Sequence, residues 1–425
     1  MIERAARRVV ERGARATAHA LVSRLKTGRL TLVEGERRVV YGSGTPQATV
    51  VVRSPALWPA LARGGLGMAD AYVDGLWESP DLPAVIELAA RNMRPIDEVR
   101  RRISPAVEPL RRARAALAPS TPERSRREIA AHYDLGNDLF GLMLDPLMQY
   151  SGAVFERRES TLEEAQRTKL DRICDKLDLG PRDHLLEIGT GWGGLAVHAA
   201  ATRGCRVTTT TLSREQHALS LERAREAGVD DLVTVLLQDY RELRGTYGKL
   251  VSVEMIEAVG WRDFGTFFAR CSALLDPAGV MVLQAITVDD RLFDVEKASR
   301  TFIREHIFPG GCLPSLEVVA RAVARDTDLR MVDLEDITPH YAETLRRWRA
   351  NVEASAAKLS QLGYEERFQR LWRLYLCWCE AGFEERRIGN VQLVLSKPRW
   401  RGAVAVPRAA TSADVRSTSP QHRVS

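Results

Sequence analysis

The chain has 425 residues, of which 45% are hydrophobic and 28% charged, so it can bury a sizeable core and is longer than one ordinary domain. Its net charge of +6 favours an anionic partner surface, which nucleic acid and anionic lipid would both provide. The sequence has no run of about 18 uncharged apolar residues, so it predicts no membrane-spanning helix. It has no CxxC pair, which predicts reduced thiols in a cytosol, and without paired CxxC sites or an HExxH motif it predicts no metal site.

Residues 1–92 are predicted to form a small α+β domain. Residues 1–26 have the spacing of an amphipathic helix with arginines off its apolar face, and they lack the apolar core and cleavage site of a secretory signal. This helix either packs on its own domain or lies on a membrane surface. Residues 29–53 alternate as strands do between Gly and Pro turns, and residues 55–92 have the pattern of short helices.

Residues 93–127 are rich in proline and arginine and are predicted to be a linker, which is either a solvated connector or an electrostatic contact with anionic lipid. From 128 to 400 strand and helix patterns alternate, which predicts an α/β domain with a doubly wound, Rossmann-like parallel sheet. Residues 401–425 have the composition of a disordered tail. The expected strands are 184–188, 205–211, 232–237, 249–254, 279–286 and 388–396, with a helical insert over 299–326 and 341–383.

A glycine-rich turn, residues 189–194, follows the strand at 184–188 and precedes a helix. Such a turn lets the backbone approach a ligand closely, and it also occurs in NAD-dependent enzymes. Here the spacing is GxGxG and Glu187 precedes it, which suits a methionine-type cofactor with a charged amino group and no pyrophosphate. Ligands bind at the carboxyl ends of strands in open α/β sheets, so the segments 211–216 and 238–241 should meet the same ligand. Ser213 is also a good helix N-cap.

Many ordered segments make residues 65–400 resemble the cyclopropane fatty acid synthase and mycolic acid cyclopropane synthase family. The resemblance implies a class I S-adenosylmethionine (SAM)-dependent C-methyltransferase. Its substrate would be the cis double bond of an unsaturated phospholipid acyl chain, and the reaction would pass through a carbocation to a cyclopropane. The segments are GLGMADAYVDGLWE (65–78, similar to the family's extra N-terminal domain), HYDLGNDLF (132–140), LDPLMQYS (144–151), LLEIGTGWGG (185–194), TLSREQ (211–216), VSVEMIEAVG (251–260), IFPGGCLPS (307–315), HYAETLRRW (340–348) and YLCWCEAGF (375–383).

The resemblance also assigns site residues. It implies cofactor contacts at Tyr150, Ser151, Gly189, Gly191, Thr211, Gln216, Asp239 and Tyr240, and the turn and strand ends add Glu187, Thr190, Gly193, Leu212 and Ser213. It further implies a bicarbonate ion near the reacting carbon, for which the matching positions are Gly152, Glu257, Gln284, Ile286 and Tyr341.

Two of the bicarbonate positions depart from the family pattern, which commonly has Cys in place of Gly152 and His in place of Gln284. A glutamine amide can hold an anion but cannot take up a proton as histidine can. Bicarbonate is therefore expected to bind more weakly here, or Glu257, the best candidate for a carboxylate beside the cation, takes over as base. Glu254 is expected to be structural or to support the site from outside.

The product and the partners follow from the same resemblance. Two subgroups of the family match different segments. The actinobacterial methyl-branching relatives are closer at EMIEAVG, LQAIT and HYAETL, whereas the cyclopropane enzymes are closer at LDPLMQY. The methyl-branching relatives convert oleoyl chains to a 10-methylene product, which a separate flavin- or NADPH-dependent reductase reduces. Two further alternatives are a SAM methyltransferase of a soluble small molecule and a lipid-binding relative without catalysis. The expected setting is cytoplasmic, peripheral at the inner face of the membrane, on an anionic bilayer, with dimerisation through the N-terminal domain and no nucleic-acid partner.

Overall fold

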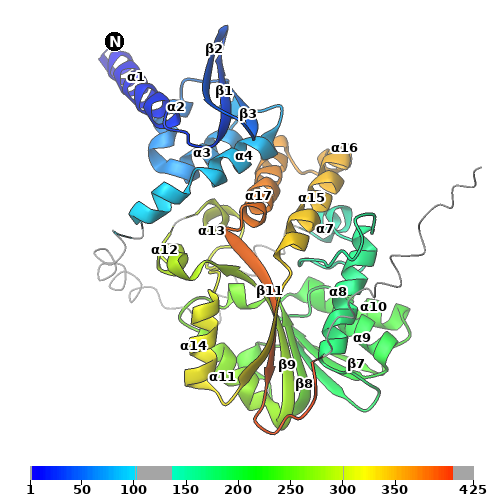
Figure 1. The fold of residues 1–425 in the computed structure, drawn as a ribbon. Helices are drawn as coiled ribbons and strands as arrows, with labels where there is room; N and C mark the ends of the chain where they lie inside the picture. Colours follow the sequence, from blue (N-terminus) through cyan, green and yellow to red (C-terminus); the bar gives the residue numbers. More distant parts are fainter. Residues whose placement is uncertain (1, 101, 103–135, 300, 405–425) are drawn as a thin grey trace, which may run out of the picture.

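The computed structural model describes residues 2–100, 102, 136–299 and 301–404, and it shows a small N-terminal domain stacked on a larger one (Figure 1). The predicted linker, 93–127, therefore lies mostly outside the described residues, and within its described part residues 94–100 are helical. The predicted tail lies outside them from residue 405 onward.

The small domain has a sheet with strand order β2-β1-β3-β4, in which β1 runs antiparallel to β2 and parallel to β3. The predicted N-terminal helix and the three predicted strands are confirmed, whereas β4 has only two residues and is too short to leave a sequence pattern. The strands are β1 (Gly28–Glu34), β2 (Arg37–Ser43), β3 (Gln47–Val52) and β4 (Trp77–Glu78), and the helices are α1 (Ile2–Val22), α2 (Leu57–Ala60), η1 (Leu61–Arg63), α3 (Gly64–Val73) and α4 (Leu82–Arg91).

The large domain is built on a seven-stranded sheet with strand order β10-β11-β9-β8-β5-β6-β7, which confirms the predicted α/β class. The sheet is mixed and not wholly parallel, because β11 runs antiparallel to both of its neighbours. The edge strand β10 was not predicted, since most of its side chains are exposed or half-buried and no apolar run marks it. The strands are β5 (His184–Ile188), β6 (Arg206–Thr211), β7 (Val233–Leu237), β8 (Tyr247–Val253), β9 (Leu275–Val288), β10 (Arg330–Asp336) and β11 (Ile388–Ser396).

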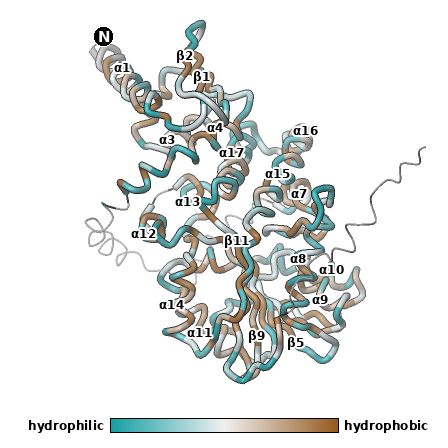
Figure 2. The backbone as a smooth tube through the Cα atoms, in the orientation of Figure 1, coloured by the Kyte–Doolittle hydropathy of each residue, from teal (hydrophilic) through white to brown (hydrophobic). Residues whose placement is uncertain are grey.

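Helices cover both faces of this sheet, whose central strands are the most hydrophobic part of the chain trace (Figure 2). Buried residues of α11 and α14 pack on one face, and those of α8, α9 and α10 pack on the other. The helices of the large domain are α7 (Asn137–Met143), α8 (Leu162–Lys176), α9 (Gly194–Arg203), α10 (Arg214–Glu226), η2 (Tyr240–Glu242), η3 (Ile256–Ala258), α11 (Phe264–Leu274), η4 (Asp290–Leu292), α12 (Phe293–Glu296), α13 (Phe302–His306), α14 (Leu316–Asp326), α15 (Thr338–Ala354), α16 (Ala356–Gln361) and α17 (Glu366–Glu384).

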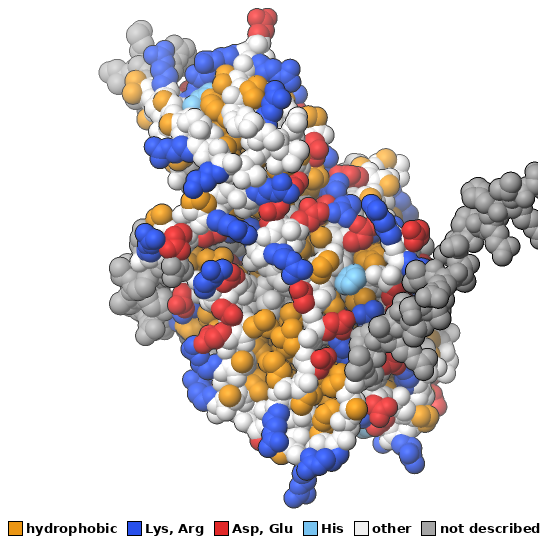
Figure 3. All heavy atoms as spheres, in the orientation of Figure 1, with side chains coloured by type: hydrophobic (Ala, Val, Ile, Leu, Met, Phe, Trp, Pro, Cys, Tyr) orange, Lys and Arg blue, Asp and Glu red, His pale blue; other side chains and the backbone are white. Residues whose placement is uncertain are grey.

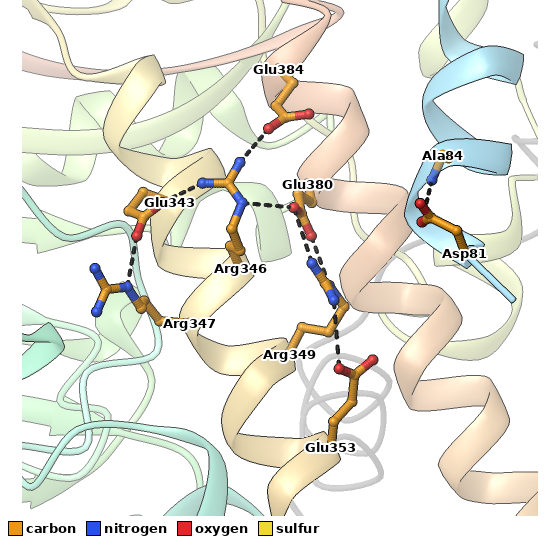
Figure 4. Close-up of polar contacts among 9 residues, drawn as sticks. All are labelled: Asp81, Ala84, Glu343, Arg346, Arg347, Arg349, Glu353, Glu380 and Glu384. Atoms are coloured by element: carbon orange, nitrogen blue, oxygen red, sulfur yellow. Dashed lines mark hydrogen bonds and ion pairs between the residues drawn. The ribbon is translucent and has the colours of Figure 1, made fainter. Parts of the chain in front are cut away.

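Helices α15 and α17 lie between the small domain and the sheet, and ion pairs fasten them to each other (Figure 4). Arg346 of α15 contacts Glu343 on its own helix and both Glu380 and Glu384 of α17. Arg349 adds a second contact to Glu380, with its Nε 3.0 Å from the carboxylate. The Arg349–Glu380 pair is shielded from solvent, because both of its side chains are largely buried, and it therefore holds the two helices together more firmly than the more exposed Arg346 pairs do.

The small domain is attached to α17 by polar contacts that add to a shared apolar core. The Arg370 guanidinium donates to the carbonyl oxygen of Tyr72 and lies over its ring, 4.3 Å from the centroid. Arg91, in the last turn of α4, pairs with Glu385 at 2.6 Å. At the other end of α4, Asp81 caps the helix by accepting from the amide of Ala84 (Figure 4). The small domain is therefore fixed relative to the helices that line the site described next.

Candidate active site

The glycine-rich turn after β5 forms one wall of a cavity of about 180 Å³ at the carboxyl ends of the parallel strands. Gly189 and Gly191 have φ angles of 102° and 53°, which favour glycine, and a side chain built at Gly191 would meet no atom within 4 Å. The backbone of the turn is thus open toward a ligand. All but two of the predicted cofactor residues line this cavity: Tyr150, Ser151, Glu187, Gly189, Thr190, Gly191, Thr211, Leu212, Gln216, Asp239 and Tyr240.

The two remaining predicted residues, Gly193 and Ser213, are not among the residues that line the cavity. Gly193 is the N-cap of α9, and its left-handed backbone packs against Ser220. Ser213 caps α10 through its Oγ, which accepts from the amide of Gln216 at 3.2 Å. Both therefore shape the helices behind the cavity.

The carboxylate of Asp239, one of the predicted cofactor contacts, is engaged by a side chain of its own loop. The Nε and Nη2 of Arg241 donate to its two oxygens at 2.9 and 2.7 Å. Tyr240 packs edge-on against Phe267, with the ring centroids 5.6 Å apart. This fixed loop closes the β7 side of the cavity.

Two buried ionisable groups flank the opposite side of the cavity. Glu187 accepts from the Thr209 hydroxyl at 2.6 Å, and burial raises the pKa of its carboxyl group to about 8. Burial lowers the pKa of Lys169 to about 8, and its ammonium donates to Gln149 Oε1 and Ser151 Oγ, both at 2.8 Å. A cationic amino group beside Glu187 would keep that carboxylate ionised, so the site fits the amino-acid end of SAM.

A second cavity, of about 260 Å³, lies against α15, α17 and the segment from α13 to residue 313. Most of its lining is apolar or aromatic, which suits an acyl chain. Cys379 is part of this lining, and burial raises the pKa of its thiol to about 12, so it is a packed neutral group. The apolar and aromatic lining residues, besides the cysteines, are Tyr150, Ala258, Ile286, Ile303, Phe308, Pro309, Leu313, Tyr341, Leu345, Tyr375, Trp378, Phe383 and Ile388.

Three residues, Tyr150, Glu254 and Ala258, line both cavities, so the two spaces meet there. The hydroxyl of Tyr150 is 2.7 Å from that of Tyr375, which holds the ring in place. A donor in the first cavity and a chain in the second would therefore face each other across these three side chains.

Glu254 directly follows β8 and stands at the centre of a hydrogen-bond network at this junction. Its Oε1 accepts from the amide of Gly152 at 3.0 Å, from Gln284 Nε2 at 2.9 Å and from Asn390 Nδ2 at 2.6 Å. Its Oε2 accepts from the Tyr341 hydroxyl at 2.7 Å. Four donors thus converge on one carboxylate and fix its position at the junction.

The donors behind Glu254 continue as a directed chain. The Oε1 of Gln284 accepts from Gln392 Nε2 at 3.0 Å, and the Oε1 of Gln392 accepts from the Lys176 ammonium at 2.7 Å. An ammonium group can only donate, so it fixes the orientation of both amides. Each NH₂ group therefore points toward Glu254.

Glu257 lines the second cavity and lies three residues after Glu254, in η3. Its Oε1 accepts from the amide of Ile286 at 2.5 Å, and its buried Oε2 has no hydrogen-bond partner among the described residues. Burial, and after it the charge of Glu254, raises the pKa of Glu257 to about 8. The five positions predicted to surround an anion thus come together, but their donors point at two carboxylates of the chain.

Sequence reasoning missed Glu254 as a central residue of the site. Its position in the sequence could have identified it, because an acidic residue immediately after the carboxyl end of a central parallel strand lies where such sheets bind ligands. Asn390 was also missed, since it comes from the start of a strand more than a hundred residues away in sequence. No cluster of His, Cys, Asp and Glu able to hold a metal ion is found in the described part of the chain.

Comparisons with known proteins add to this geometry. Residues 120–393 match the mycolic acid cyclopropane synthetase family. The tuberculostearic acid methyltransferase UfaA1 of Mycobacterium tuberculosis is 39% identical over 406 residues, covering 91% of this chain and 93% of that protein. The cyclopropane-fatty-acyl-phospholipid synthase of Escherichia coli (strain K12) is 36% identical over 362 residues, covering 84% of this chain and 89% of that protein.

Solved structures give the same picture for the large domain. The mycolic acid cyclopropane synthase CmaA1 in complex with SAH and CTAB superposes with a TM-score of 0.60 at 31% sequence identity. The match covers 64% of this chain and 98% of that one.

Proposed function

Because the chain belongs to the mycolic acid cyclopropane synthetase family and is a SAM-dependent C-methyltransferase of fatty acyl chains, we propose that it methylates the cis double bond of oleoyl-type chains in membrane phospholipids and releases a methylene-branched chain. A separate enzyme would then reduce the methylene group to a methyl branch. Ring closure to a cyclopropane is the second candidate, which the 36% identity to the E. coli synthase favours.

The observation that carries this proposal is the junction of the two cavities at Tyr150, Glu254 and Ala258. Bound SAM supplies an electrophilic methyl group. There the cavity lined by the predicted cofactor residues adjoins an apolar one that fits an acyl chain, so an alkene and the methyl donor can be aligned without intervening water. Such alignment supplies much of the rate for a weak nucleophile such as an alkene.

The residues at the junction suit a reaction that creates positive charge on the acyl chain. The carboxylate of Glu254 and the faces of Tyr150 and Phe308 can stabilise a cation, and the apolar lining excludes the water that would capture it. A Tyr150 ring clamped at its hydroxyl by Tyr375 can also hold the alkene against the donor.

The choice of product rests on the chemistry after methyl transfer and on the relatives. Loss of a proton from the new methyl group closes a cyclopropane if it occurs at once. If a hydride first moves from the methylated carbon to its neighbour, the same proton loss leaves a methylene branch on the chain. The 39% identity with a tuberculostearic acid methyltransferase over 91% of this chain supports the second course.

The surface of the small domain supports an acyl substrate that resides in a bilayer. The apolar side chains Val9, Val10 and Leu21 of α1 are exposed, by 68%, 59% and 63%. Many Lys and Arg side chains lie on the visible face of this domain (Figure 3). Amphipathic helices and basic surfaces bind anionic lipid. No helix within the described ranges is long and apolar enough to cross a membrane.

The test is lipid analysis of a bacterial host that makes oleoyl phospholipids and expresses this chain. Mass spectrometry should find acyl chains that gained one CH₂ unit, and NMR should find the two vinylic protons of a methylene group. Cyclopropane protons would instead identify the second candidate. Purified protein should need liposomes for activity; methylation of soluble small molecules with no product in liposomes would contradict the proposal.

A further inference from the structure

The groups expected to hold bicarbonate are already engaged by carboxylates of the chain itself. Of the five positions, the Gly152 amide, the Gln284 amide group and the Tyr341 hydroxyl donate to Glu254, and the Ile286 amide donates to the remaining member, Glu257. An added anion would have to displace the Glu254 carboxylate from its donors and lie beside two acidic groups. The residues present therefore do not fit bicarbonate.

The backbone of the site is adapted to this arrangement. Glu254 has a φ of 49°, the left-handed region that costs a non-glycine residue free energy, and its carboxylate is held there by four donors. A Cβ at Gly152 would lie 2.7 Å from the Asn390 amide nitrogen and 3.0 Å from the Tyr341 ring. The absence of a side chain at Gly152 thus gives room for two groups that bind Glu254.

We propose that Glu254 is the base of the reaction, and that it replaces bicarbonate as the acceptor of the proton lost by the methylated acyl chain. The inference rests on the proposed function, because it assigns a group to the last step of that reaction. Glu254 lines both cavities and so contacts the place where the methyl group arrives, whereas Glu257 lines only the second one.

The step balances without any further reactant. The π electrons of the alkene form the new carbon–carbon bond to the methyl group, and the electron pair of the broken S–C bond stays on sulfur. In the methylene course a hydride first moves from the methylated carbon to the neighbouring cationic carbon, whereas ring closure needs no such shift. In both courses a C–H bond of the new methyl group then breaks, its electron pair completes the methylene or the ring, and the proton passes to a carboxylate oxygen of Glu254. The proton then leaves to solvent after product release.

The groups around Glu254 favour this residue over its neighbours as the acceptor of the proton. Four donors, one of them at the end of the hydrogen-bond chain from Lys176, hold the Glu254 side chain in place at the junction of the two cavities. Burial keeps the pKa of Tyr341 well above its usual value, so this hydroxyl remains a donor. The raised pKa of Glu257 keeps that side chain mostly protonated at neutral pH, and it therefore does not compete for the proton.

The first experiment uses the wild-type protein with oleoyl phospholipid vesicles and labelled SAM, in buffer purged of carbon dioxide and in the same buffer with added bicarbonate. We expect the initial rates to agree within about twofold. A wild type that methylates the lipid, loses most of its activity on purging and recovers it with bicarbonate would overturn the inference and leave the proposed function intact. A wild type that methylates no acyl chain would refute both.

The second experiment compares Glu254→Gln with Glu257→Gln, its neighbour in the same site. The oxygen of the Glu254→Gln amide can keep the contacts to Gly152, Gln284 and Asn390, and its NH₂ can donate to the Tyr341 hydroxyl, so SAM should bind within about threefold in calorimetry. Its turnover should fall by about 10²-fold or more, the contribution of a general base, and part of the residual product should carry a hydroxyl group from water capture of the cation. Glu257→Gln should lose less than about tenfold.

Two further results decide the matter. Glu254→Gly suits the left-handed backbone and exposes the four donors, so restoration of its activity by added bicarbonate would support the inference directly. A Glu254→Gln protein that binds SAM and turns over within about threefold of the wild type would overturn it.

Discussion

Replacing Gly152 with alanine tests how tightly the junction is built. The added Cβ would lie 2.7 Å from Asn390 Nδ2, which is about 0.7 Å inside an ordinary contact, and 3.0 Å from the Tyr341 ring. The ring stacks on Phe383 at 4.2 Å and cannot retreat freely, so the Asn390 amide must move and release Glu254. Overpacking and the lost charge-assisted hydrogen bond should together lower the free energy of unfolding by about 2–4 kcal/mol.

A double-mutant cycle isolates the Gly152–Asn390 term. Asn390→Ala should by itself cost about 1.5–3 kcal/mol, because it removes one donor to a charged group. In the Gly152→Ala/Asn390→Ala protein the new methyl group has room on that side, so the two costs should fall short of additivity by at least about 1 kcal/mol. Urea unfolding followed by tryptophan fluorescence measures all four proteins, and additivity within about 0.5 kcal/mol would refute the steric reasoning.

Three other predictions concern the cavities and the buried acids. Ala258→Phe should block the junction, lowering methyl transfer by more than about tenfold while calorimetric SAM affinity changes by less than about threefold; equal loss of both would contradict the two-cavity geometry. Asp239→Ala should weaken SAM binding by about 10-fold to 100-fold, since a buried charged acceptor is lost, and unchanged affinity would exclude Asp239 as a ligand. The Glu257 pKa of about 8, against an ordinary value of 4.5, means that its contribution to stability is fully present below pH 4.5 and is lost as the pH rises through about 8. Glu257→Gln should therefore lose less stability than the wild type between pH 5 and pH 9, by on the order of a few kcal/mol in denaturant titrations, and parallel pH profiles would contradict the burial of this acid.

Much of the fold could be predicted because its signals are local. The strand pattern at 184–188 and the glycine turn that ends it lie within a dozen residues of each other, so both can be recognised in one stretch of sequence. The predicted β5 agrees with the structure at both ends. The edge strand β10 could not be predicted in the same way, because its exposed and charged side chains leave neither an alternating nor a continuous apolar pattern.

The site shows the same division between local and distant information. Motif positions such as Tyr150 and Gly189 were found because each motif is contiguous. The partners of Glu254 come from the segment at 152 and from β9, α15 and β11, and only folding brings these four together. No sequence window contains the information that Asn390 fills the space left by Gly152.

The ion pairs between α15 and α17 have a consequence for an enzyme that must keep a cavity open for its substrate. A channel that admits a flexible lipid tail cannot gain rigidity from its own interior, because filling it would abolish its use. Here the rigidity comes from ion pairs outside the cavity, where Arg346 and Arg349 of α15 both bind Glu380 of α17. The cavity can then take up and release an acyl chain while its walls keep their spacing.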